Sequence, residues 1–423
     1  MEKSKTFCIL PWIHAATYTD GSVLLCCVAK NSGSINLNHQ NWQQAWNSDH
    51  FKQARLAMLE GRAFNACDHC YKEEAAGIRS HRQNENNLWY RELGSEYLDN
   101  LVQATRADGH VDNDIITIDL RLGNTCNLQC VMCRPVDSSK WVRDANILAN
   151  ELQTDAKYDW KYKLENFAID NFDWYKDPEF WNSFFESAKD IRHIILAGGE
   201  PLYIKEHKEI LTQLVNKGFS KNIELRYHTN GTIYNQSIVD LWQEFRRVEV
   251  MISLDGHGEV NSYIRYPADW HLLEKNLELY DCTPDVVDPK ILCTVQALNI
   301  YWLPEFADWL ISKNFKKISK KHHKGLFHPG ILHWPQYLSI KVFPIEIKKQ
   351  ISHKLTQYCQ QYPNNHQIQK FLGLVDFMNS EDHSHKFSEM IEYLEKLDDL
   401  HNTDYHTILD WISYGIDDNK LFR

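Results

Sequence analysis

The sequence predicts an α/β fold: a partial (β/α)6 barrel between a cysteine-containing N-terminal module and a helical C-terminal region. Three observations predict it. Short runs rich in Ile and Val alternate with longer helical stretches in the middle of the chain, which is typical of a parallel sheet. Cysteines gather near the start of the chain and again just after the first of these runs. From about Ser339 onward, helical patterns dominate.

Six short apolar runs are the predicted strands of the barrel, because they are rich in β-branched residues and several end in Gly or Asn. The helical stretch after the second run places apolar residues from Ile210 to Val215 on one face and ends at Gly218. The predicted strands are Ile116–Leu122, His193–Leu196, Ile223–His228, Val248–Leu254, Ile291–Val295 and Lys317–Lys320.

The chain of 423 residues is long enough for several cores, and we expect three regions. These are the N-terminal module at residues 1–112, the barrel at 113–325 and the helical region at 326–423. The barrel carries an insertion at 135–190, whose aromatic residues favour amphipathic helices packed on the barrel over a substrate-lining role. The insertion's aromatic residues include Trp141, Trp160, Phe172, Trp174, Phe180, Trp181, Phe184 and Phe185.

Bulk composition restricts the function. The net charge of −11 disfavours a sequence-independent nucleic-acid surface, which requires a basic field over the phosphates. We expect a soluble cytoplasmic protein, because no apolar run reaches the ~20 residues of a membrane span and the start of the chain lacks the apolar core of a secretory signal. Eleven cysteines, an odd number in a large chain, favour metal or redox chemistry over a disulfide framework.

The strongest local signal is CNLQCVMC, which spaces Cys126, Cys130 and Cys133 as C-x3-C-x2-C directly after the first predicted strand. Three thiolates on one short loop can hold three corners of a [4Fe–4S] cubane and leave one iron open to a small chelating molecule. The alternatives are a zinc site or buried thiols. Zinc usually takes paired C-x2-C knuckles and four protein ligands, so the x3 spacing disfavours it.

Further turns follow the later predicted strands, at the carboxyl ends where barrel enzymes build their active sites. Their residues are Gly198, Gly199, Glu200 and Pro201 of the GGEP turn, Thr229 and Asn230 of TNG, and Ser253 and Asp255 of SLDG, with Gln296 and Asn299 after the fifth strand. Together with the cysteine loop and with Arg265 in NSYIRYP, these turns make the segment from Ile116 to Lys320 resemble the radical S-adenosylmethionine (SAM) superfamily.

The resemblance implies a role for several of these segments. The GGEP turn would contact the amino group of SAM, and Arg265 would lie near its carboxylate. Gln296 and Asn299 would contact the ribose or adenine. Met132 stands where the superfamily often has an aromatic residue against the adenine, and its thioether can make similar contacts. The implied chemistry is reductive cleavage of SAM to a 5′-deoxyadenosyl radical that abstracts hydrogen from a substrate, with an electron donor such as flavodoxin or ferredoxin.

A second cysteine set lies in the N-terminal module. Cys8, Gly21 and Cys26 are spaced C-x12-G-x4-C, and a hairpin turn at Asp20–Gly21 would bring the two cysteines together. Cys67 and Cys70 add a C-x2-C knuckle after a helical stretch, so composition alone also allows a zinc ribbon.

This second set is similar to the twitch and SPASM modules of radical SAM enzymes, although these usually follow the barrel. The trailing cysteines of a full SPASM module are missing, so the resemblance implies one auxiliary [4Fe–4S] cluster. Its four ligands would be Cys8, Cys26, Cys67 and Cys70. Cys26 and Cys27 compete for one ligand position, and the spacing favours Cys26.

Three hypotheses follow for the function. The first is an oxidoreductase-type radical SAM enzyme that modifies a peptide or protein segment by oxidation, cross-linking or epimerisation, as twitch and SPASM enzymes often do. The second is a radical SAM enzyme for a small metabolite or nucleotide. The third is a zinc-binding adaptor without enzymatic activity.

Overall fold

The structure is a computed structural model that describes residues 4–31, 35–75, 77, 79–151, 172–323 and 325–412. The chain divides into two compact units. Unit 1 comprises Met1–Thr125, Phe167–Tyr227 and Asp240–Val248, and unit 2 comprises Cys126–Asn166, His228–Val239 and Glu249–Arg423. The region boundaries after residues 112 and 325 stay a prediction.

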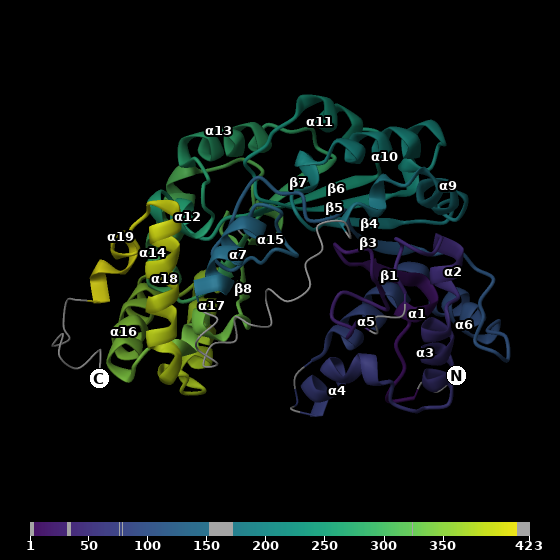
Figure 1. The fold of residues 1–423 in the computed structure, drawn as a ribbon, viewed down its shortest axis with the longest axis horizontal. Coiled ribbons are helices and arrows are strands. Elements are labelled where there is room, and N and C mark those ends of the chain that lie inside the picture. Colours follow the sequence, from purple (N-terminus) through teal and green to yellow (C-terminus); the bar gives the residue numbers. More distant parts are fainter. Residues whose placement is uncertain are drawn as a thin grey trace. The chain divides into compact units, whose positions relative to one another are not determined.

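The described strands form one eight-stranded sheet with the order β2-β1-β3-β4-β5-β6-β7-β8 (Figure 1). The order from β3 to β8 follows the chain, and the β3–β4, β4–β5 and β7–β8 pairs are parallel, as consecutive strand–helix units predict. The strands are β1 (His14–Thr17), β2 (Val23–Leu24), β3 (Thr117–Arg121), β4 (His193–Ala197), β5 (Glu224–Thr229), β6 (Arg247–Ser253), β7 (Val287–Val295) and β8 (Phe327–Ile331).

In unit 1, the N-terminal module extends the sheet. β1 pairs parallel with β3, where Ala16 faces Asp119, and antiparallel with β2. The predicted hairpin turn is present: Tyr18 N donates to Ser22 O at 2.7 Å, and Gly21 has a φ of 85°, which glycine adopts without steric cost. The turn therefore carries the chain back from β1 toward Cys26.

The helices of unit 1 begin at clear sequence signals. Capping boxes open α2 at Asn41 and α5 at Ser80, and α9 begins with an Asp177 cap followed by Pro178. Trp160, from the aromatic insertion, lies outside the described residues. The helices are α1 (Leu10–Ile13), α2 (Trp42–Trp46), α3 (Asp49–Leu59), α4 (Asp68–Ala75), α5 (His81–Leu93), α6 (Ser95–Gln103), α9 (Pro178–Glu186) and α10 (Lys205–Asn216).

Unit 2 contains the later strands and the helical C-terminal part, whose predicted helical character is confirmed. None of the helices within the described ranges is both long enough and apolar enough to cross a membrane. α11 (Gln236–Trp242) crosses the boundary between the units. The other helices are α7 (Trp141–Glu151), α12 (Glu259–Ile264), α13 (Trp270–Asp281), α14 (Leu303–Lys313), α15 (Lys320–His323), α16 (Ile345–Gln361), α17 (His366–Asn379), α18 (Phe387–His401) and α19 (His406–Leu409).

The prediction of the sixth strand at Lys317–Lys320 is wrong, because the strand is β8. Backbone amides of Lys316, Lys317 and Ile318 donate to the Asp281 carboxylate at 2.7–3.0 Å, which holds this segment as a loop instead of a strand. β8 lies ten residues later and contains Pro329 and a glycine. It is the last strand of the order, an edge position where a proline without an N–H is tolerated.

Candidate functional site

The loop with Cys126, Cys130 and Cys133 follows β3 and is fastened inside unit 2. The Val131 amide donates to Ile264 O at 2.8 Å, and the hydroxyl of Tyr393, on α18, donates to Val131 O at 2.6 Å. Cys126 and Cys130 are buried and Cys133 is half-buried. Helix α18 therefore helps to hold the cysteine loop in place.

Hydrogen-bond donors and one cation surround these sulfur atoms. Asn230 Nδ2 lies 4.0 Å from Cys126 Sγ, and Arg265 Nη1 lies 4.0 Å from Cys130 Sγ. A hydrogen bond from Cys133 lowers the pKa of Cys130, and the same bond raises that of Cys133. Donors to sulfur and a nearby positive charge stabilise thiolates, which are the form that binds iron.

Polar residues that follow β6 and β7 form a buried network in unit 2. Asp255 and Arg265 make an ion pair at 2.9 Å, and their side chains are 0% and 9% exposed. Burial raises the pKa of Asp255, and the Arg265 guanidinium opposes that shift. Asn299 Nδ2 donates to Asp255 O at 2.9 Å and also to Thr294 O, and the Asn299 side chain accepts from the amide of Gln296. The structure thus brings together four residues that the resemblance assigned to SAM.

Several polar atoms of this network are buried without a partner in the described part of the chain. They include both amide atoms of Gln296, which is 0% exposed, Nε of Arg265 and Nδ2 of Asn261. An unpaired buried polar group costs about 1–3 kcal/mol, so such groups require a ligand or water. Their mixture of donors and acceptors fits the hydroxyl, nitrogen and carboxylate groups of SAM.

The remaining predicted residues of unit 2 lie at strand ends or on the loop. Asn230 Nδ2 also donates to Asn127 Oδ1 at 2.9 Å, and Thr229 Oγ1 accepts from Gly231 N at 3.2 Å. Ser253 is half-buried at the end of β6. Met132 packs against the buried cluster formed by Cys126, Leu128, Cys130 and Ala268. Its side chain therefore lies against the buried residues of the cysteine loop to which it belongs.

The GGEP turn belongs to unit 1 and follows β4. Gly199 has a φ of 53°, and a Cβ atom there would clash with the carbonyl oxygen of Thr125, the residue before Cys126 in the chain. The Glu200 amide donates to that same oxygen at 2.9 Å. The Glu200 side chain is 1% exposed and accepts from Leu202 N at 3.0 Å, and Pro201 begins the following turn of 3₁₀-helix. Glycine is required here because the two backbones touch.

The structure brings Cys8, Cys26, Cys67 and Cys70 together in unit 1. Burial raises the pKa of Cys8, and the charges of Cys67 and Cys70 raise it further. Burial likewise raises the pKa of Cys26, with additional contributions from Cys27, Cys8 and Cys67. Burial and the charge of Cys70 raise the pKa of Cys67 to about 12. Four thiols close enough to oppose one another's ionisation need a cation between them to become thiolates.

Cys27 has different neighbours. Its sulfur lies 3.9 Å from His81 Nε2, and its side chain is exposed, whereas those of Cys8, Cys26 and Cys70 are buried. The geometry therefore favours Cys26 as the fourth ligand of the N-terminal set.

Backbone amides also hydrogen-bond the sulfurs of this set. Those of Leu10 and Arg82 hydrogen-bond Cys8 and Cys70; burial raises the pKa of both thiols, and each hydrogen bond offsets part of that rise. The Arg82 guanidinium pairs with Glu74 and donates to Phe7 O at 2.6 Å, and this buried cation acts on Cys8, Cys67 and Cys70. Such donors tune iron–sulfur clusters, so the residues present fit one.

Within the described ranges, no three His, Cys, Asp or Glu side chains converge as they would around a single metal ion. In a cubane, each thiolate binds a different iron.

Sequence reasoning missed Arg82, Asn261 and Tyr393. Asn261 Oδ1 accepts from the Asp255 amide at 3.0 Å and so holds the SLDG turn. Arg82 follows the Ser80 capping box, a visible signal for a helix but not for a cluster contact. Tyr393 comes from α18, far away in the chain, and no local pattern marks it.

Two family profiles match the chain. The radical SAM superfamily matches residues 120–280, and the iron–sulfur cluster-binding domain SPASM matches residues 8–71. No curated protein matches.

Several solved structures are similar at low identity. Streptococcus suis SuiB bound to S-adenosylmethionine is 11% identical over 74% of this chain and 62% of its own, with a TM-score of 0.32. SuiB bound to the precursor peptide SuiA is 13% identical over 84% and 74%, also with a TM-score of 0.32. TYW1 with a lysine–pyruvate adduct is 11% identical over 59% and 72%, with a TM-score of 0.29. The chain thus spans less than two thirds of the length of SAM-bound SuiB.

The two matched ranges contain both cysteine sets, and the radical SAM range also contains Asp255, Asn261 and Arg265 of the buried polar network. They imply S-adenosylmethionine, a SAM-binding [4Fe–4S] cluster and an auxiliary [4Fe–4S] cluster as cofactors. Residues 120–280 thus form a radical SAM superfamily domain, and residues 8–71 form a SPASM-type cluster-binding module that precedes it in the chain.

Proposed function

We propose that this radical SAM enzyme modifies a peptide or protein segment by oxidation, cross-linking or epimerisation. When bound, SAM and its cluster supply a radical that abstracts hydrogen from an unactivated carbon. Cys126, Cys130 and Cys133 would hold that cluster, and Cys8, Cys26, Cys67 and Cys70 would hold the auxiliary one. The chain's other residues bind the substrate, orient its carbon and exclude water.

A set of unpaired polar atoms in unit 1 carries this proposal. Thr19 Oγ1, Asp119 Oδ1 and Arg121 Nε are buried and have no hydrogen-bond partner among the described residues. Thr19 is 2% exposed and Asp119 is 4% exposed. Because a buried unpaired polar group is costly, three in one place indicate a ligand.

These three residues lie beside the GGEP turn. A Cβ atom at Gly198 would stand 2.7 Å from Arg121 Cβ and 3.1 Å from Thr19 Cγ2, so the missing side chain leaves room for both. Arg121 Nη2 lies 3.6 Å from Asp119 Oδ2, and the guanidinium lies 5.4 Å from the Tyr18 ring. The unpaired atoms therefore adjoin the turn that the family uses to contact SAM.

Their chemistry matches an amide group. Arg121 Nε–H can donate to a carbonyl oxygen, and Asp119 Oδ1 can accept from an N–H, while Thr19 can do either. The Arg121–Asp119 pair has no net charge, and the Asp119 carboxylate would repel a phosphate. A peptide bond supplies the required acceptor and donor together, so the site favours a peptide over a nucleotide.

The test uses the anaerobically reconstituted enzyme with SAM, a chemical reductant and each short peptide encoded beside its gene. We expect mass spectrometry to show loss of two hydrogens, or deuterium incorporation from D2O for epimerisation. Flavodoxin or ferredoxin is the proposed electron donor and replaces the reductant in a second series. Turnover of a small metabolite or nucleotide, with every peptide left unchanged, would contradict the proposal.

Thr19→Val and Asp119→Asn are the matched variants. Both should lower kcat/KM for the peptide roughly ten-fold or more, since Thr19→Val removes a hydrogen bond to the substrate and Asp119→Asn replaces a charged acceptor by a weaker neutral one. SAM cleavage without substrate should stay at the wild-type rate. A parallel loss of both activities would instead indicate damage to the SAM site.

A further inference from the structure

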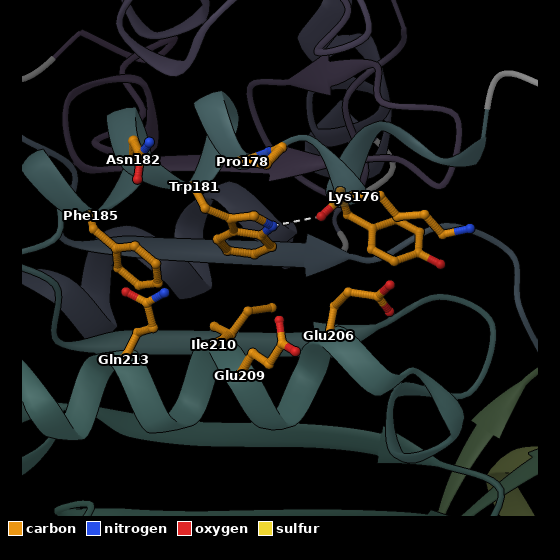
Figure 2. A pocket seen from close by; sticks show the side chains of 10 residues that line it. Lys176, Pro178, Trp181, Asn182, Phe185, Glu206, Glu209, Ile210 and Gln213 are labelled. Atoms are coloured by element: carbon orange, nitrogen blue, oxygen red, sulfur yellow. Dashed lines mark hydrogen bonds between the residues drawn. The ribbon is translucent and has the colours of Figure 1, made fainter.

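A pocket of about 170 Å³ lies between α9 and α10 in unit 1. Figure 2 shows Trp181 and Phe185 pointing from α9 toward α10, and Glu206, Glu209 and Ile210 pointing back from α10. Trp181 and Phe185 are four residues apart on α9, and Glu206 and Ile210 are four apart on α10, so each pair shares one helix face. The pocket is thus built by two regular helices.

The aromatic side of the pocket is fixed in orientation. Trp181 Nε1 donates to Tyr175 O at 2.6 Å, so its N–H is satisfied within the protein. Phe180 and Phe184 are fully buried and pack edge to face against Trp181, with distances of 4.8 and 5.7 Å between the ring centroids. Trp181 itself is half-buried. Part of this large ring therefore remains uncovered at the pocket.

The opposite side of the pocket carries negative charge. Glu206 is half-buried and Glu209 is exposed, and neither makes a hydrogen bond or ion pair with a described residue. Lys176, which also lines the pocket, donates instead to Asp173 at 2.8 Å. Two carboxylates and an aromatic ring that face the same pocket attract a cation, because the cation interacts favourably with the negative charges and with the face of the ring.

The pocket's rim already shows this interaction. Lys176 Nζ lies 5.8 Å from the Tyr175 ring, and Lys217 Nζ lies 5.6 Å from the Phe185 ring. In the part of the chain that the structure describes, no such cation covers Trp181, the ring between them. A cation from outside the chain could therefore bind over the Trp181 ring, as lysines do at the two neighbouring rings.

We propose that this pocket binds a lysine or arginine side chain of a peptide. The aliphatic stem lies on Trp181 and Ile210, and the charged head lies between Glu206 and Glu209. Long basic side chains suit such a site, because they bury their methylene groups and keep their charge at the surface. This site goes beyond the proposed function, since it recognises a peptide at a surface that takes no part in the chemistry.

The test is 19F NMR of the reconstituted enzyme labelled with 5-fluorotryptophan, in which Trp181→Phe assigns the Trp181 resonance. The probe is acetyl-Ala-Lys-Ala-amide, and the matched probe replaces lysine with uncharged norleucine. We expect the lysine peptide alone to shift the Trp181 resonance saturably. No shift, or an equal shift with norleucine, would overturn the proposal. Tighter binding of spermidine than of the peptide would assign the pocket to a free polyamine and would also overturn it.

A pair of double variants separates the pocket from the general negative charge of the protein. Glu206→Gln/Glu209→Gln should weaken binding of the lysine peptide roughly ten-fold. Glu278→Gln/Glu395→Gln removes the same charge from exposed positions elsewhere and should leave binding unchanged. Equal weakening by both doubles would show a non-specific attraction and would refute the pocket. Because this assay contains no SAM turnover, its failure is distinct from failure of the proposed function.

Discussion

Arg265→Met is expected to abolish SAM binding and to destabilise the protein by about 3–5 kcal/mol. The variant leaves the Asp255 carboxylate buried at 0% exposure without its cation, and an uncompensated buried charge has a cost of this size. It also removes the positive charge 4.0 Å from Cys130 Sγ. Anaerobic denaturant unfolding and equilibrium dialysis with labelled SAM measure the two effects.

The double variant Asp255→Asn/Arg265→Met separates stability from binding. It removes both charges, and an asparagine at position 255 can still accept from the Thr294 amide, which donates to Asp255 at 2.7 Å. Replacing both members of a buried ion pair is often nearly neutral, so most of the lost stability should return while SAM binding does not. Wild-type SAM affinity in the single variant would remove Arg265 from the site.

Cys26→Ala is expected to lower the iron content from about eight to about four atoms per chain, because it removes one ligand of the auxiliary cluster. The neighbouring Cys27→Ala should keep all the iron, since the Cys27 side chain is exposed and its sulfur lies beside His81. Iron and sulfide analysis of the two variants, prepared side by side, gives the comparison.

The reverse pattern, with iron lost only in Cys27→Ala, would make Cys27 the ligand. Substrate-free cleavage of SAM should persist in Cys26→Ala, because the SAM-binding cluster rests on other cysteines. Its loss there would mean that the two cysteine sets are not independent. Circular dichroism of both variants controls for unfolding.

Local patterns predicted the strands that end in functional turns. β3 to β7 lie where the apolar runs placed them, since each run is long enough to reveal its β-branched residues. β8 escaped detection because Pro329 and Gly330 disfavour a strand, and only an edge position in the sheet allows them. Edge position is a property of the folded sheet and cannot be read from the run itself.

The functional residues also divide into those that a local motif reveals and those that depend on the folded structure. Short motifs marked the cysteine loops, the GGEP turn and Asp255, since their spacing reflects one local turn. In unit 1, Arg82 and the proposed substrate contact Thr19 reach their neighbours only through contacts between distant segments, and in unit 2 the Tyr393 hydroxyl reaches Val131 O in the same way. A single polar residue on a strand, hairpin or helix has no local signature for such a contact.

Iron and sulfide counts on the reconstituted wild type and on a Cys126/Cys130/Cys133→Ala variant, each with a SAM-cleavage assay, test the assignment of two clusters to two cysteine sets most directly. We predict about eight irons in the wild type and about four in the variant, with 5′-deoxyadenosine formed only by the reduced wild type. About four irons in the wild type and none in the variant would contradict the auxiliary cluster. Colourless protein with bound zinc and no iron would contradict the account as a whole.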